Sequence, residues 1–256
     1  VVMDGLRSFV ALLIIIISFT CGSHLKASGS DKRNVRDNAQ SAEGDYYSGF
    51  ANDANMLRLA KSGEYSFHQI GCFGRSLRSK GVWKRKDDIV HMSAYKKMYE
   101  MLWYIRRSCG KLKMVRWGKR QYLLHPHAIV DFCNDVNSGA EPRSCLLGME
   151  YLKDGHWEIE VTGYPSLPEK YMGYILKKPI VGKVLRLKSV GQGEDLKARA
   201  ILNVGKSNGL RKGMKLYDVS GDCVGTFEVV KVLNKYSVAR LHIPSLFLYH
   251  RIQARL

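Results

Sequence analysis

The six cysteines include no CxxC pair, so the sequence lacks the spacing typical of a thiol redox centre or a zinc ribbon. Acidic residues are scarce: 23 Asp and Glu accompany 41 Lys and Arg, which gives a formal net charge of +18. One apolar run, residues 9–20, is about a dozen residues long, short of the roughly 20 that a transmembrane helix needs. These absences disfavour redox catalysis, a zinc ribbon and a full helical membrane span.

The short apolar run instead fits a bacterial export signal. Arg7 precedes it, and Cys21 directly follows it with small residues behind, an arrangement that resembles the lipid-attachment site of bacterial lipoproteins. We predict that residues 1–21 are a signal peptide or a membrane anchor, with Cys21 as the lipidation candidate. Simple cleavage is one alternative, and a buried core strand or helix is another. The expected location is the cell envelope, either periplasmic or membrane-anchored through the N-terminus.

Residues 22–56 are polar and contain few large aliphatic side chains. Such a segment buries too little apolar surface to offset the entropy lost on ordering, so we predict a disordered tether. The remainder predicts a β-rich basic domain over 57–178 and a small β-barrel domain over 180–256. The fold class is mostly β, or β-rich α+β: a β-meander with one or two helices, followed by the barrel.

Alternation of apolar and polar residues predicts the strands of the first domain. Residues 64–70 alternate with a period of two, and residues 80–85 and 89–92 are typical of two strands around an acidic turn at 86–88. Residues 115–124 form a strand pair with a tight turn at Gly118. Residues 95–105 fit either a helix or a strand. Pro126 precedes an apolar stripe at helical spacing that ends before Gly139, which predicts a helix. Residues 156–161 look like a further strand.

Three segments carry a family resemblance. The sequences RWGKRQYL (residues 116–123), DFCNDVNSGAEPR (131–143) and GYPSLP (163–168) resemble a family of exported or lipid-anchored bacterial envelope proteins. The resemblance covers about residues 64–178. It implies an envelope location and a β-rich first domain, and it implies no particular activity.

The C-terminal domain shows five short strand patterns, at residues 181–187, 198–204, 214–219, 225–232 and 236–241. Glycine-rich turns between short strands predict a small closed barrel. The sequence LNVGKSNGLRKGM (202–214) is similar to a turn in the C-terminal β-domain of flagellar assembly protein T. This similarity implies a module that makes contacts rather than one that catalyses a reaction.

Several short patterns suggest chemistry only weakly. Residues 205–209 match the G-x-S-x-G nucleophile elbow, but the four residues that follow are too few for the required helix, so the glycines more plausibly serve a strand connection. His125 and His127 lack a third ligand at fixed spacing. The acidic pairs at 87–88 and 158–160 fit solvated positions better than an acid/base couple. We predict no catalytic residues, no metal site and no cofactor.

Cysteines in an exported chain favour disulfides. Cys72 and Cys109 are the more plausible partners, whereas Cys133 lies on the apolar stripe of the predicted helix and fits a core position. The pairing is left open.

Positive charge is concentrated between residues 75 and 120, where fifteen Lys and Arg accompany three acidic residues. The candidate basic binding face comprises Lys84, Arg85, Lys86, Arg106, Arg107, Lys119 and Arg120. Anionic lipid head groups, acidic glycans or another envelope protein are the expected partners, and no nucleic acid is expected because of the export signal. We predict a non-enzymatic binding or scaffolding protein. The alternatives are an enzyme acting on a cell-wall polymer and a basic nucleic-acid-binding module.

Overall fold

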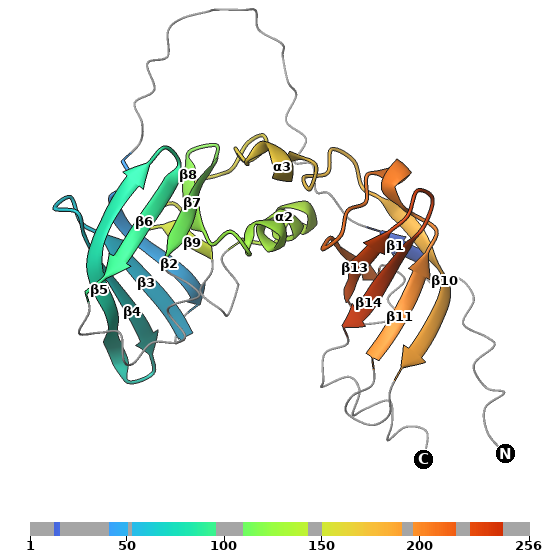
Figure 1. The fold of residues 1–256 in the computed structure, drawn as a ribbon, viewed down its shortest axis with the longest axis horizontal. Coiled ribbons are helices and arrows are strands. Elements are labelled where there is room, and N and C mark those ends of the chain that lie inside the picture. Colours follow the sequence, from blue (N-terminus) through green and yellow to red (C-terminus); the bar gives the residue numbers. More distant parts are fainter. Residues whose placement is uncertain are drawn as a thin grey trace, which may run out of the picture. The chain divides into compact units, whose positions relative to one another are not determined.

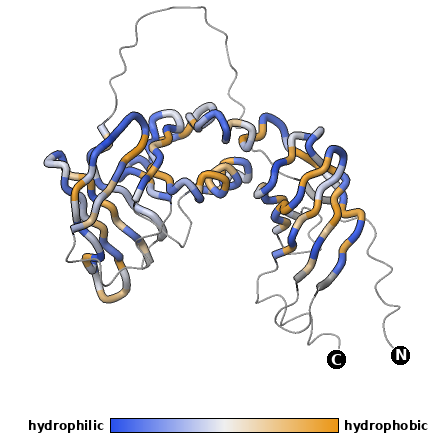
Figure 2. The backbone as a smooth tube through the Cα atoms, in the orientation of Figure 1, coloured by the Kyte–Doolittle hydropathy of each residue, from blue (hydrophilic) through white to orange (hydrophobic). Residues whose placement is uncertain are grey.

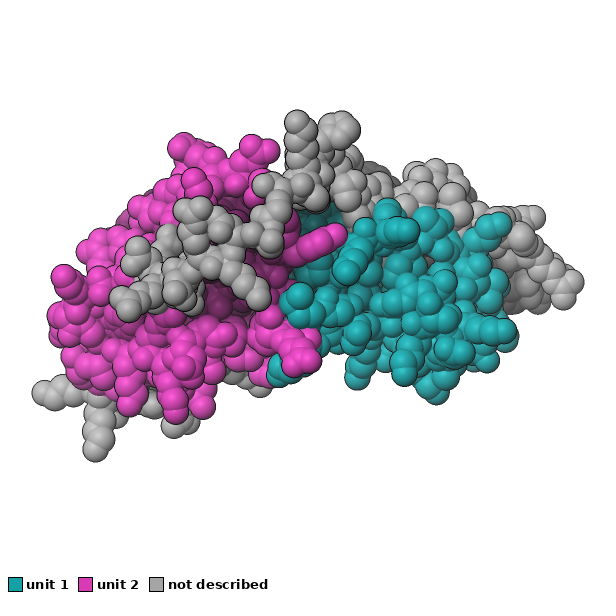
Figure 3. All heavy atoms as spheres, turned by 90° about the horizontal axis from the view of Figure 1, so that it is seen from above, with its two compact units in different colours: residues 1–19, 133–140, 170–256 teal, residues 20–132, 141–169 magenta. Residues whose placement is uncertain are grey.

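The computed structural model describes residues 13–15, 41–50, 53–95, 110–142, 150–190, 197–218 and 226–242. The chain is mostly β, as the sequence predicts. It divides into two compact units (Figure 3). We call residues 20–132 with 141–169 the barrel unit, and residues 1–19, 133–140 and 170–256 the C-terminal unit.

The barrel unit is a closed antiparallel meander of eight strands (Figure 1). Its strands are β2 (Gly44–Phe50), β3 (Asp53–Leu59), β4 (Glu64–Gly71), β5 (Gly74–Lys86), β6 (Ile89–Ala94), β7 (Lys111–Trp117), β8 (Arg120–Leu124) and β9 (Glu150–Lys153). Each strand pairs with the next, and β2 pairs with β9 to close the barrel. Closure leaves no unpaired sheet edge.

Alternation along the strands builds the barrel interior. Successive side chains of a strand point to opposite faces, and Figure 2 shows hydrophobic and hydrophilic positions alternating along the strands. The inward residues form one buried cluster: Ala42, Tyr46, Leu57, Leu59, Tyr65, Phe67, Val90, Met92, Leu112, Met114, Leu123 and Tyr151. Barrels of eight strands are wide enough to be filled by side chains or to hold one small ligand.

The predicted tether over residues 22–56 is wrong for its second half. Residues 44–50 form β2, and β3 begins at Asp53. The outward positions Asp45, Tyr47 and Gly49 supply little aliphatic surface, but Tyr46 points inward and is fully buried. The partner strands supply most of the apolar surface, so low hydrophobicity in β2 itself did not prevent it from joining the barrel. Residues 22–40 lie outside the described part of the chain.

Helix α2 (Ile129–Ser138) confirms the predicted helix, although it begins at Ile129 after a turn that contains Pro126. It ends at Gly139, whose φ of 74° is a left-handed conformation that glycine adopts at little cost. In the barrel unit, the Phe132 ring packs edge-on against Tyr122 and Trp117, with centroid distances of 5.1 and 6.5 Å. Phe132 of the motif at 131–143 therefore packs against two aromatic residues of the motif at 116–123.

Irregular chain follows β9, and the strand expected at residues 156–161 is wrong. Side chains rather than a strand ladder hold these residues: the carbonyls of Trp157 and Ile159 accept from the Arg120 guanidinium, and the His156 ring accepts from the Gln121 backbone amide. The indole nitrogen of Trp117 donates to the Gly163 carbonyl at 2.9 Å, and Ser166 exchanges two hydrogen bonds with the backbone of Arg116. The GYPSLP segment is thereby fixed against the end of β7.

The C-terminal unit contains the five predicted strands: β10 (Val181–Val190), β11 (Lys197–Leu202), β12 (Lys215–Asp218), β13 (Thr226–Val232) and β14 (Ser237–His242). They form a curled sheet in the order β10-β11-β14-β13-β12. The short strand β1 (Leu13–Ile15) pairs with both β10 and β12 and closes the sheet. These three residues lie within the predicted export segment.

The C-terminal half of α2 is bound into the C-terminal unit by two buried asparagines. Asn134 donates to the Gly213 carbonyl and accepts from the Lys215 amide, both at 3.0 Å. Asn137 donates to the Tyr174 carbonyl at 2.8 Å and accepts from the Leu176 amide at 2.9 Å. Tyr174 precedes β10 and follows helix α3 (Glu169–Met172). Residues 133–140 and 170–178 thus belong with the C-terminal sheet.

Candidate functional site

The outer face of β5 carries exposed cations. Lys80, Lys84 and Lys86 are exposed, whereas the alternate positions from Ser79 to Arg85 are buried or half-buried. Two large apolar side chains lie on the same outer surface: Leu77 is 44% exposed and Val82 is 47% exposed. The surface is therefore both basic and apolar.

Neighbouring strands extend this basic surface. Lys84 lies opposite His91 on β6, and His91 lies opposite Lys111 on β7. Adjacent strands are about 4.8 Å apart, and like charges close together on one sheet face are unfavourable. We define the lysine face as Lys80, Lys84, Lys86 and Lys111, with His91 between them. Lys113 is excluded because Asp88 forms an ion pair with it.

Arg85 does not belong to this face. Its side chain is directed to the inner side of β5, where its Nε donates to the Asp87 carbonyl at 2.5 Å. Asp87 has a φ of 56° in the two-residue β5–β6 turn, a left-handed conformation that aspartate tolerates. The buried hydroxyl of Tyr46 is close enough for the Arg85 charge to act on its pKa.

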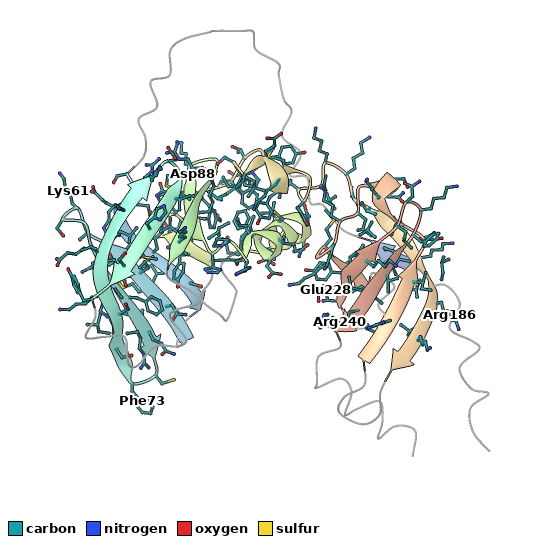
Figure 4. The ribbon with its side chains drawn as sticks, in the orientation of Figure 1. Lys61, Phe73, Asp88, Arg186, Glu228 and Arg240 are labelled. Carbon is teal, nitrogen blue, oxygen red and sulfur yellow. The ribbon has the colours of Figure 1, made fainter. Side chains whose placement is uncertain are left out.

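A cavity of about 310 Å³ lies at this end of the barrel. Its lining residues are Arg85, Asp88, Met114, Arg116, Ser166, Leu167 and Pro168. Figure 4 labels Asp88 at this end and Phe73 at the tip of the opposite end. We call this cavity the mouth pocket. Its two arginines, Arg85 and Arg116, come from strands β5 and β7, which are separated by β6.

Buried polar groups occupy the same end of the barrel interior. The Gln121 amide nitrogen donates to the Tyr46 hydroxyl at 2.6 Å, and this hydroxyl donates to the Ala42 carbonyl at 2.8 Å. Burial raises the pKa of Tyr46 well above its usual value, and the Gln121 hydrogen bond and the Arg85 charge only partly oppose this. Tyr46 is therefore a neutral hydrogen-bonding group at any physiological pH.

Arg120 is a correction to the predicted basic face. It is only 9% exposed, and its guanidinium donates to Glu141 Oε2 at 2.7 Å, to the Ile159 carbonyl at 2.5 Å and to the Trp157 carbonyl at 3.0 Å. Because these acceptors occupy the N–H groups of Arg120, the side chain has a structural role and is not available to a binding partner. Lys119, one residue earlier, is exposed in the β7–β8 turn. Arg106, Arg107 and the lipidation candidate Cys21 lie outside the described residues.

The serine of the G-x-S-x-G pattern has a structural role. Its residues form a 3₁₀ turn (Lys206–Asn208) that ends at Gly209, whose φ is 87°. Ser207 donates its hydroxyl to the Asn234 carbonyl at 2.8 Å. The Ser207 hydroxyl is hydrogen-bonded within a strand connection and is not placed as the nucleophile of an elbow would be.

Metal-binding and paired-acid patterns gain no support. The rings of His125 and His127 are 5.1 Å apart, but within the described ranges no group of three His, Cys, Asp or Glu side chains is placed to hold a metal ion. Glu158 and Glu160 are exposed on the irregular segment. Among the described residues, Asp88 is the one carboxylate that lines the mouth pocket.

Two cysteines, Cys72 and Cys133, fall in the described part of the chain, and neither is in a disulfide. Cys72 is exposed, and Cys133 is buried in α2, as its place on the apolar stripe predicts. The remaining cysteines lie outside the described residues.

Comparisons with known proteins found no matching family model, curated protein or solved structure. The resemblances to envelope proteins and to flagellar assembly protein T therefore stay predictions. Within the described ranges, no helix has the length and apolarity to cross a membrane.

Sequence reasoning missed the mouth pocket because its residues come from three separate segments. Arg116, Ser166, Leu167 and Pro168 were part of recognised motifs, but their contact with Arg85 depends on barrel closure. The alternation of a strand could have indicated it: Arg116 follows the inward Met114 by two positions, so its side chain lies on the same inner face.

Proposed function

We propose that this protein is a non-enzymatic binding protein of the bacterial cell envelope and that its lysine face contacts an anionic membrane surface. The observation that carries the proposal is the combination of exposed lysines and exposed apolar side chains on the outer face of β5. Each lysine near an anionic leaflet contributes about 1 kcal/mol of attraction.

The apolar component favours lipid over acidic glycan. Leu77 and Val82 lie between cations on the same strand, and Phe73 is fully exposed at the tip of the β4–β5 turn. Side chains of this kind gain free energy in the headgroup and acyl boundary of a bilayer, whereas a hydrated polysaccharide offers them no apolar environment. The envelope location rests on the export segment and belongs to the same proposal.

Vesicle co-sedimentation tests the proposed function. The full chain should bind phosphatidylglycerol vesicles and not phosphatidylcholine vesicles, and binding should weaken as salt rises from 0.05 to 0.5 M, because screening shortens the range of the attraction. The L77S/V82S variant should lose vesicle binding and keep any binding to polygalacturonate, an acidic glycan. Equal loss on both partners, or binding to the glycan alone, would reject the lipid assignment.

A further inference from the structure

We propose that the mouth pocket is a second binding site, which takes the phosphate group of a small organic phosphate. The site goes beyond the proposed membrane contact and does not depend on it. Its two arginines, Arg85 and Arg116, are directed to the inner side of the barrel, opposite to the lysine face. Barrel closure brings them to one cavity although they are distant in the sequence.

The charges of the pocket favour an anion. Asp88 contributes a carboxylate to the lining, but it is paired with Lys113. Among the described residues that line the pocket, Arg85 and Arg116 are therefore the cations, and Asp88 is a carboxylate that already has a partner. Within the described ranges, the Arg116 guanidinium makes no hydrogen bond or ion pair to another residue. Two arginines that share one cavity repel each other, and a bound anion removes this cost.

The hydrogen-bond donors favour phosphate over carboxylate. A carboxylate has two oxygens and is saturated by one bidentate guanidinium, whereas a phosphate monoester has three terminal oxygens and a charge near −2. The pocket offers two guanidiniums and the hydroxyl of Ser166. The Ser166 Oγ accepts the Arg116 amide at 3.1 Å, and the hydroxyl proton can still be donated.

The volume of the pocket and its apolar lining residues determine which organic group the phosphate can carry. A cavity of about 310 Å³ is at the lower end of the roughly 300–1,000 Å³ typical of ligand sites. Met114, Leu167 and Pro168 supply apolar surface beside the cations. A phosphate that carries a short organic group, of the size of glycerol phosphate, fits this combination better than a polymer.

Ser166 and Arg85 are held in place before any ligand binds. Ser166 is anchored by reciprocal hydrogen bonds with Arg116, and Arg85 is anchored on the Asp87 carbonyl at 2.5 Å. The Met114 amide donates to the Asp88 carbonyl at 2.7 Å, which ties the β5–β6 turn to β7. A site whose donors are already positioned loses less entropy on binding.

Isothermal titration calorimetry of the full chain with glycerol 3-phosphate tests this site. We expect saturable binding at one site, no binding of glycerol, and weaker binding of inorganic phosphate, which lacks the organic group. R116Q should weaken glycerol 3-phosphate binding at least tenfold, and R116K should weaken it less because the charge remains. The double variant K84S/K86S should leave the Kd within about twofold, since these lysines lie on the other face.

Absence of saturable binding, or an unchanged Kd in R116Q, would overturn the proposal. The melting temperature of R116Q should lie within a few degrees of the parent's. If R116Q is less stable than that, the comparison of R116K with the parent tests the site instead. Phosphatidylglycerol vesicles should bind R116Q as tightly as the parent, which assigns the pocket to a free phosphate compound. Loss of vesicle binding in R116Q would overturn that assignment in favour of a lipid head group.

Discussion

The side chains of Lys84 and Arg85 lie on opposite sides of β5, although the two residues are consecutive in the sequence. Lys84 is exposed on the lysine face, and Arg85 lines the mouth pocket. The period of two in a strand requires this separation. The basic stretch therefore supplies two different surfaces, and a variant that replaces both residues at once would mix their effects.

We expect Arg120→Met to destabilise the barrel unit by about 3 kcal/mol, because it leaves Glu141 and two carbonyls without their donor. Unfolding in urea, followed by tryptophan fluorescence, measures this. Trp83, Trp117 and Trp157 belong to the barrel unit, and the residues of the C-terminal unit include no tryptophan, so the fluorescence follows the barrel unit.

The matched control for Arg120 is its neighbour in the turn. Lys119→Met removes the same charge from an exposed position, and its free energy of unfolding should stay within about 0.5 kcal/mol of the parent. Similar losses in the two variants would contradict the structural role assigned to Arg120.

Acid should weaken the barrel unit through His156. The backbone amide of Gln121 donates to the His156 Nδ1 at 2.9 Å. Burial lowers the pKa of His156, and the nearby charges of Lys153 and Arg120 lower it further. Below about pH 6.5 the unfolded chain takes up a proton that the folded chain resists, so stability present above this pH is lost as pH falls towards the lowered folded pKa. The urea midpoint should therefore be lower at pH 5 than at pH 7.5.

His156→Asn should reduce this pH dependence, because asparagine keeps an acceptor near the Nδ1 position and does not titrate. Part of the dependence should remain, since burial also lowers the pKa of His68. An identical change of midpoint with pH in the parent and in His156→Asn would show that His156 does not titrate as described.

Removal of residues 1–20 should leave the C-terminal sheet folded. Its buried core is built from residues 180–241, and β1 adds only three paired residues between β10 and β12. We expect a chain that starts at Cys21 to give dispersed amide NMR signals for β10–β14. Collapse of those signals would mean that residues 13–15 are an essential strand, and the export interpretation of this segment would fail.

Periodicity predicted the elements that have a clear apolar face. The strands β4–β8, the helix α2 and the five strands from β10 to β14 all fall where alternation or helical spacing placed them. The turn at Gly118 has a φ of 57°, as expected for a tight turn that needs glycine.

Composition gave wrong predictions where a few residues determine the local structure. In β2 the burial falls on few inward side chains, chiefly Tyr46, and the segment as a whole contains few large aliphatic residues. Arg120 was placed on the basic face because charge was counted along the chain, whereas its position on β8 directs it to Glu141 and the irregular segment. The mouth pocket needs barrel closure, which no local pattern encodes.

The most direct test of the proposed function is vesicle binding by two variants with the same loss of charge. K84S/K86S/K111S removes three lysines of the lysine face, and K177S/K178S/K235S removes three exposed lysines of the C-terminal unit. At about 1 kcal/mol per lysine, the first variant should bind phosphatidylglycerol vesicles on the order of 100-fold more weakly than the parent. The second should bind within a few-fold of the parent. Equal weakening in both would mean that net charge alone attracts the protein, and the lysine face would have no specific role.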